Sequence, residues 1–248
     1  MKIVSGLVYA VFAIASAASI KLPKGFIQCK KSDPKFDECI KNALQSSVPQ
    51  LIKGVPSLGL ITSDPYRIAS LNIEQGIGPV SVNMNFTDLI VSNMKYTIID
   101  SAHYDPKSYR LNVETHVPNS LLMEGDYEVN GKVLILPIVG KGRCKFIIDV
   151  LKFTGNVEMK PVFRKEQMYL EVANLTWTFI PINFHVQLDN LFNGNKALGD
   201  HMNVFLNENW REVLSELQPA IEEVFGALFT SIGQQFLNRV PENQIFLD

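Results

Sequence analysis

The sequence lacks the motifs by which many enzymes are recognised. It contains no G-x-S-x-G nucleophile elbow, no H-E-x-x-H zinc motif, no P-loop and no G-x-G-x-x-G turn before a helix. Its histidines stand singly, without a second ligand at metal spacing, at His103, His116, His185 and His201. We therefore expect no catalytic residue, no metal ligand and no cofactor. Distant carboxylates can still converge in a fold, so a hydrolase of lipophilic esters stays as an alternative.

A cluster of basic residues is also missing. The 23 Lys and Arg are scattered and nearly balanced by 25 Asp and Glu, which gives a formal net charge of −2. Nucleic acids and anionic lipid surfaces bind to basic patches or stripes. The charge pattern therefore argues against both kinds of partner.

Long apolar runs are scarce beyond the N-terminus. Residues 1–17 have the parts of a signal peptide, with Lys2, an apolar stretch from Leu7 to Ala15 and small residues after it. The stretch is shorter than the roughly 20 residues that span a bilayer. The longest later run, Val133–Val139, suits a buried strand. We expect a secreted, extracellular protein without stable membrane insertion. No linker or repeat divides the chain, which predicts one domain over residues 18–248.

Three cysteines leave an odd one in an oxidising compartment. Cys29 and Cys39 flank a polar turn, so we expect them to pair and to close a short loop worth ~3 kcal/mol. Cys144 lies in an alternating segment and is expected to be a small buried side chain. The alternative for Cys144 is an intermolecular disulfide or a reactive thiol.

Two sequons make Asn85 and Asn174 candidates for glycosylation in a secreted protein. If Asn85 faces water, alternation along its strand turns Val82, Met84 and Phe86 inward.

Most of the chain has the alternation of half-buried antiparallel strands. A helix is expected from Asp33-Pro34 to about Leu51. Hairpin turns are expected at 104–108 and 164–167, and bulges at Gly131 and Gly155. The expected strands are 68–74, 79–91, 95–100, 108–118, 125–139, 144–153, 156–162, 168–179 and 183–188.

The final fifty residues show helical spacing instead. Apolar residues step by three or four from Leu198 to Val240. Pro219 predicts a kink within this helix, and Pro241 should end it before a short strand or tail. The predicted fold is α+β, with a highly curved antiparallel β-sheet wrapped around a long C-terminal helix and an elongated apolar tunnel between them.

Aromatic and methionine side chains are the candidates for the lining of that tunnel, with plain core packing as the alternative for each. Burial of ~300 Å² of apolar ligand surface contributes ~7 kcal/mol to the binding free energy, before the entropy cost of ordering the ligand and the protein is subtracted. The candidate ligand-binding residues are Val82, Met84, Phe86, Tyr127, Phe146, Ile148, Trp177, Phe184, Met202, Phe205, Trp210, Phe225 and Phe229.

Several segments together resemble the insect takeout and haemolymph juvenile hormone binding proteins, over essentially the whole mature chain. These are the cysteine pair, residues 54–60 with Asp64-Pro65, residues 125–131, and above all residues 190–200 with 207–210. The resemblance implies a TULIP-like carrier of juvenile hormone, another terpenoid or a long-chain lipid. It also implies links to circadian, feeding or chemosensory signalling.

The hormone binders usually have a second disulfide, for which only Cys144 remains here, and this places the chain nearer to takeout. The ending Ile245-Phe246-Leu247-Asp248 departs from the usual Ile-Phe-Pro. Tyr127 falls in the matching Gly-x-Tyr motif and is a candidate donor to a ligand oxygen; its alternative is a core tyrosine bonded to backbone. We expect a monomeric carrier of a small hydrophobic ligand. The alternative is an interaction protein that joins a partner through Cys144 or the tail.

Overall fold

The computed structural model describes residues 22–248 except 24, 77 and 165. The predicted signal peptide, residues 1–17, lies outside the described residues. One two-stranded and one seven-stranded sheet form in the described part. The small parallel pair consists of β1 (Cys29–Lys30) and β9 (Phe246–Leu247). The large sheet consists of β2 (Tyr66–Gln75), β3 (Val80–Ser92), β4 (Ile98–Asp105), β5 (Arg110–His116), β6 (Leu121–Val133), β7 (Leu136–Arg164) and β8 (Gln167–Leu188).

β7 is the spine of the large sheet. Its first half pairs with β6, its second half with β5, and its other side pairs with β8 from Cys144 to Arg164. β2–β3 extend the sheet beyond β6, and β4 extends it beyond β5. All these pairings are antiparallel. Three of the pairings, β3–β6, β4–β5 and β7–β8, contain register shifts, which bend strands and increase twist.

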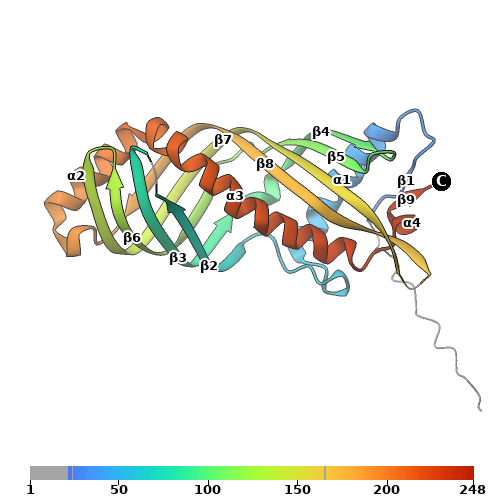
Figure 1. Cartoon of the computed structure of the whole chain (residues 1–248), viewed down its shortest axis with the longest axis horizontal. Helices are drawn as coiled ribbons and strands as arrows, with labels where there is room; N and C mark the ends of the chain where they lie inside the picture. Colours follow the sequence, from blue (N-terminus) through green and yellow to red (C-terminus); the bar gives the residue numbers. More distant parts are fainter. Residues whose placement is uncertain (1–21, 24, 77, 165) are drawn as a thin grey trace, which may run out of the picture.

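Helices close the open side of this sheet. α3 (Trp210–Leu237) lies diagonally across it and contacts both β8 and β2, while α1 (Phe36–Lys53) packs against β4 (Figure 1). α2 (Lys196–Glu208) covers the end near β6. No described helix is long and apolar enough to cross a membrane. The short helices are η1 (Pro56–Leu58), η2 (Met94–Tyr96), η3 (Phe192–Gly194) and α4 (Glu242–Ile245).

The predicted long helix is interrupted, although not where the sequence suggested. α3 continues through Pro219 as one helix, and a hydrogen bond to β8 lies on each side of the proline, from Gln218 to the Phe179 carbonyl and from Trp177 to the Glu222 carbonyl. The interruption lies at Asn209, which has φ −107° and ψ 21°. The Asn209 side chain donates to the carbonyl of Phe205 at 2.8 Å. The helical bonds from the Asn209 N–H to the Phe205 carbonyl and from the Val213 N–H to the Asn209 carbonyl persist at 3.0 and 3.1 Å, so the interruption is confined to the backbone dihedrals of Asn209.

Several strand predictions were also wrong in their boundaries. The run Val133–Val139 is not one buried strand, because Leu134 and Ile135 form the turn between β6 and β7. Leu134 has φ 54°, as a tight two-residue hairpin requires, and Ile135 is 87% exposed. The expected strand 95–100 begins later, at Ile98, after the 3-10 turn η2.

The predicted pairs 144–153 with 156–162, and 168–179 with 183–188, are each one continuous strand. The bulges expected at Gly131 and Gly155 lie elsewhere in the register. A Cβ at Gly131 would lie 2.2 Å from the Ser81 carbonyl oxygen, so the close approach of β3 explains that glycine. Gly155 has no neighbour within 4 Å of an added Cβ.

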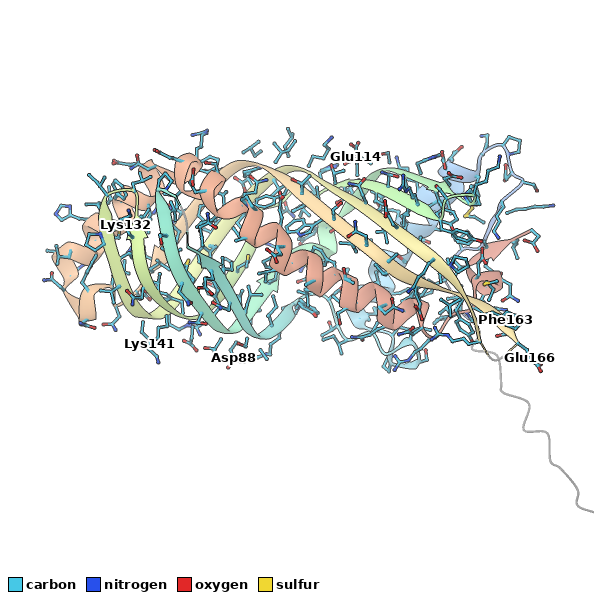
Figure 2. The ribbon with its side chains drawn as sticks, in the orientation of Figure 1. Asp88, Glu114, Lys132, Lys141, Phe163 and Glu166 are labelled. Carbon is cyan, nitrogen blue, oxygen red and sulfur yellow. A yellow bond between two sulfur atoms is a disulfide. The ribbon has the colours of Figure 1, made fainter. Side chains whose placement is uncertain are left out.

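The outer face of the sheet is polar. Ion pairs cross between β6 and β7 at Glu124–Lys145, Asp126–Arg143 and Glu128–Lys141, with N···O distances of 3.3, 3.3 and 3.2 Å. Figure 2 shows Lys141 and Asp88 pointing away from the sheet. Such exposed pairs are worth ~0–1 kcal/mol each, so they define the wet face more than they stabilise it.

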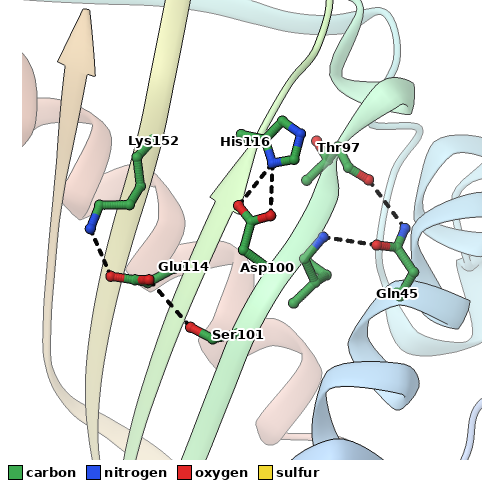
Figure 3. A network of polar contacts seen from close by, with 8 residues as sticks. Gln45, Thr97, Asp100, Ser101, Glu114, His116 and Lys152 are labelled. Atoms are coloured by element: carbon green, nitrogen blue, oxygen red, sulfur yellow. Dashed lines mark hydrogen bonds and ion pairs between the residues drawn. The ribbon is translucent and has the colours of Figure 1, made fainter.

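Amide side chains from the helices bond to the free edges of the sheet. At β4, the Gln45 amide accepts from the Ile99 N–H at 2.8 Å and donates to the Thr97 carbonyl at 3.2 Å (Figure 3). At β8, the Asn203 amide bonds both backbone groups of Leu188, each at 2.9 Å. Asn207 does the same at Val186, with distances of 2.9 and 2.7 Å. These amides take the place of neighbouring strands.

Candidate ligand-binding site

Four cavities lie in a row between α3 and the concave face of the sheet. We name them the α2-end cavity, the aromatic cavity, the α1 cavity and the terminal cavity, with volumes of about 120, 320, 470 and 350 Å³. Each shares wall residues with the next: Phe225 separates the first three, and Ile232 borders the last two. Their α3 lining runs from Val213 to Leu237, about 36 Å at the helical rise per residue.

The α2-end cavity has a wholly apolar lining. It lies among β2, β3, β6, β7 and β8, under Leu206 of α2 and Val213–Phe225 of α3. Strand alternation explains the composition, because every second residue of a half-buried strand faces inward. Any ligand atom here meets only carbon and sulfur.

The aromatic cavity is walled by rings from two strands and α3. Trp177 of β8 meets Phe225 and Phe229 edge-on, with centroid distances of 5.9 and 5.3 Å. Its indole N–H donates to the Glu222 carbonyl of α3 at 2.7 Å, which fixes the ring. Edge-to-face packing and this hydrogen bond hold a rigid wall.

The α1 cavity is the largest of the row and contains most of its polar side chains. It lies between α1, the loop after η1 and the α3 segment Phe225–Gln235. Its polar lining consists of Ser47, Ser63, Tyr66, Thr97 and Gln235. Exposed Ile61 and Gln235 also line it, so the cavity reaches the surface between that loop and α3.

The terminal cavity is closed by the N- and C-terminal segments. Cys29 and Phe246, on the paired strands β1 and β9, both line it. Cys29 and Cys39 form the predicted disulfide, with a Cα–Cα distance of 5.8 Å. Tyr104 stacks on Phe246 at 4.5 Å, and its hydroxyl is buried without a hydrogen-bond partner among the described residues. Burial raises the pKa of Tyr104 strongly, so this phenol stays protonated.

Most of the candidate residues line the row. The α2-end cavity is bordered by Val82, Met84, Phe86, Phe146, Ile148, Phe184 and Phe225, and the aromatic cavity by Ile148, Trp177, Phe225 and Phe229. Asn85 is exposed on the opposite face of the strand, as alternation predicted; Asn174 is exposed too. Whether either sequon is glycosylated stays a prediction.

Four candidates lie outside these cavities. Tyr127 is buried and its hydroxyl donates to the Asp189 carbonyl at 2.8 Å, which is the core alternative considered for it. Met202 and Phe205 pack in the core beneath α2, and Trp210 packs against Val150, Phe179 and Leu214. Helical spacing predicted that these side chains face inward, but in this region the residues that border the free space are Leu206 and Leu214.

The polar residues of the α1 cavity were not predicted. Ser47 occupies an inward position of α1 between Leu44 and Leu51, and a hydroxyl within an apolar stripe was the available signal. Thr97 and Tyr66 come from segments far apart in the sequence. Only the register of the sheet brings them to one place.

The other titratable groups of the described residues do not line the tunnel. His103 and His116 each contact one carboxylate, Asp37 at 2.7 Å and Asp100 at 2.8 Å. Among the described residues, no group of three or more His, Cys, Asp or Glu could hold a metal ion. Burial raises the pKa of Cys144 to about 11, and its thiol donates to the Gly125 carbonyl at 3.5 Å. Cys144 is buried and so is not open to an intermolecular disulfide, whereas Leu247 and Asp248 of the tail are exposed.

Comparison with known proteins agrees with this architecture. The crystal structure of takeout 1 from Epiphyas postvittana superposes with a TM-score of 0.76 at 27% identity, covering 89% of this chain and 99% of that one. The predicted α+β, TULIP-like fold with a curved sheet and C-terminal helices is thereby confirmed.

Curated relatives match along most of their length. The circadian clock-controlled protein daywake of Drosophila melanogaster is 26% identical over 239 residues, which is 92% of this chain and 90% of that protein. A putative beta-carotene-binding protein of Schistocerca gregaria is 22% identical, over 87% of this chain and 85% of that protein. Residues 7–247 match the family model of the haemolymph juvenile hormone binding proteins (JHBP), and the chain belongs to this family of ligand-binding carriers.

Proposed function

We propose that this protein is an extracellular carrier that encloses one elongated lipophilic molecule. The observation that carries the proposal is the row of four cavities with shared walls, about 36 Å long and apolar along most of its length. Binding sites for small molecules have volumes of this order and few polar groups. Burial of ligand surface here is the source of affinity.

The family and the relatives support a terpenoid or long-chain lipid as cargo. One relative is named for beta-carotene and the family for juvenile hormone. The rigid rings of the aromatic cavity offer flat surface to an isoprenoid or aliphatic chain. The same proposal includes secretion through the signal peptide 1–17 and a single mature domain from residue 18. It also includes a monomeric state and a circadian role like that named for daywake.

Native mass spectrometry of the secreted protein, followed by organic extraction, tests the proposal. A lipophilic adduct of defined mass is the expected result, and the extract identifies its class. A protein that is free of adduct and takes up neither juvenile hormone, beta-carotene nor a long-chain fatty acid would contradict the carrier function. Ester hydrolysis that survives repurification would favour the hydrolase instead.

A further inference from the structure

Polarity is distributed unevenly along the tunnel. The α2-end cavity has no polar side chain in its lining, and the aromatic cavity has three threonines at its border. The α1 cavity, which lies between the aromatic and terminal cavities, has the five polar residues named above. The tunnel is therefore apolar at its α2 end and polar at an internal position.

The polar groups of the α1 cavity can both accept and donate hydrogen bonds. The Ser47 hydroxyl donates to the Leu44 carbonyl at 2.7 Å, and the Thr97 hydroxyl donates to the Met94 carbonyl at 2.6 Å. Their protons are thus engaged, and their oxygens remain as acceptors. The half-buried Tyr66 hydroxyl has no partner among the described residues, and burial raises its pKa, so it remains a donor.

The α1 cavity has apolar space on both of its sides. Toward α2, the lining continues along α3 from Phe225 to Val213, about 18 Å. Toward the C-terminus, the terminal cavity follows α3 from Ile232 to Leu237, about 8 Å. The whole row exceeds the ~30 Å of two acyl chains laid end to end in a bilayer, so a single acyl chain fills only about half of it.

A ligand with a polar end group fits this arrangement poorly. In the α2-end cavity, such a group would lose its hydrogen bonds to water without replacement. In the terminal cavity, the Tyr104 hydroxyl is buried with no surface open to a ligand, and the other polar side chain in the lining, Ser47, lies at the border with the α1 cavity. The α1 cavity offers partners, yet a chain that ended there would leave one side of the row empty.

We propose that the tunnel selects lipids whose oxygen function lies within the chain. The oxygen occupies the α1 cavity beside Ser47, Tyr66 and Thr97. The longer apolar arm occupies the aromatic and α2-end cavities, and the shorter arm occupies the terminal cavity. This inference rests on the carrier function proposed above and narrows its cargo class.

Two isomeric alcohols test the inference: docosan-7-ol, with an internal hydroxyl and unequal arms, and docosan-1-ol, with a terminal one. Their affinities are measured by displacement of the fluorescent probe N-phenyl-1-naphthylamine from the delipidated full-length mature protein. We expect the internal alcohol to bind about five-fold more tightly, the effect of one net hydrogen bond. The variant Tyr66→Phe/Thr97→Val should lose this preference. Thr115→Val, which removes a hydroxyl from the inward-facing side of the aromatic cavity, should keep it.

Each outcome has a separate meaning. Equal affinities, a preference for the terminal alcohol, or a preference that survives in Tyr66→Phe/Thr97→Val would overturn the inference and leave the carrier function intact. The carrier function and the inference would be overturned together if neither alcohol displaced the probe and if juvenile hormone, beta-carotene and fatty acids also neither displaced it nor bound. Thermal melting of each variant shows that loss of preference is not loss of folding.

Discussion

Replacement of Gly155 by phenylalanine should block the tunnel at the aromatic cavity without harm to the fold. Gly155 lies on β7 and lines that cavity, and an added Cβ would meet nothing within 4 Å. Its backbone does not have positive φ, so a side chain brings no backbone strain. The neighbours at 153 and 157 line the same cavity, so the new ring should enter the free space.

The magnitude follows from the ligand atoms displaced. A phenylalanine ring takes the place of about four ligand methylene groups at ~0.8 kcal/mol each, so affinity should fall by ~3 kcal/mol, or roughly 100-fold. The melting temperature should stay the same or rise, because the ring buries apolar surface in existing space.

Docosan-1-ol binding, measured by probe displacement, is the assay, with melting followed by circular dichroism. Gly155→Ala is the matched control, since a methyl group leaves most of the cavity open and should change affinity little. A short apolar ligand that fits in the α1 and terminal cavities should still bind to Gly155→Phe. Unchanged affinity for docosan-1-ol in a folded Gly155→Phe protein would refute the assignment of this cavity as part of the ligand path.

Four further outcomes are expected. The double variant Cys29→Ala/Cys39→Ala should lose ~3 kcal/mol of stability and melt roughly 6–12 °C lower in calorimetry, whereas an unchanged melting point would show that the loop contributes nothing. Because the pKa of Cys144 rises from 9.0 to about 11, its thiol should resist iodoacetamide in the native protein at pH 8, and rapid labelling of the native protein would contradict this. The contribution of the protonated thiol to the free energy of unfolding should be fully present below pH 9 and should be lost as the pH rises to about 11. Tyr127→Phe should cost about 1–2 kcal/mol in chemical denaturation and leave ligand affinity unaltered, whereas weakened binding with unchanged stability would restore the donor role. Asn203→Ala should cost about 2–4 kcal/mol, since it leaves two buried backbone groups of β8 unpaired, and a loss under 1 kcal/mol would show that water replaces the amide.

The periodicity of apolar residues predicted the features that depend on which face of an element is buried. Alternation placed Val82, Met84 and Phe86 on the inner face, and helical spacing located the C-terminal helices. The change from strand alternation to helical spacing also predicted the curved sheet around them, and the resemblance to the takeout family agreed with this prediction. These predictions succeeded because each element exposes one face and buries the other.

Predictions failed where the backbone conformation of one residue or a distant contact decides the structure. The turn at Leu134 and Ile135 is apolar, so composition concealed it. The helix is interrupted at Asn209, where the sequence has neither proline nor glycine, while Pro219 is accommodated. Whether an inward residue meets a cavity or another side chain depends on packing across the sheet. For this reason Trp210 packs in the core, whereas Trp177 lines the aromatic cavity.

The amides that bond to β4 and β8 have a consequence for self-assembly. A strand with free N–H and C=O groups can template the addition of another chain, and a sheet that must remain open around cargo cannot remove its borders by closing into a barrel. Gln45, Asn203 and Asn207 occupy those groups from within the molecule. These two edges are thereby protected against fibril growth, and loss of the amides should appear as aggregation before it appears as loss of ligand binding.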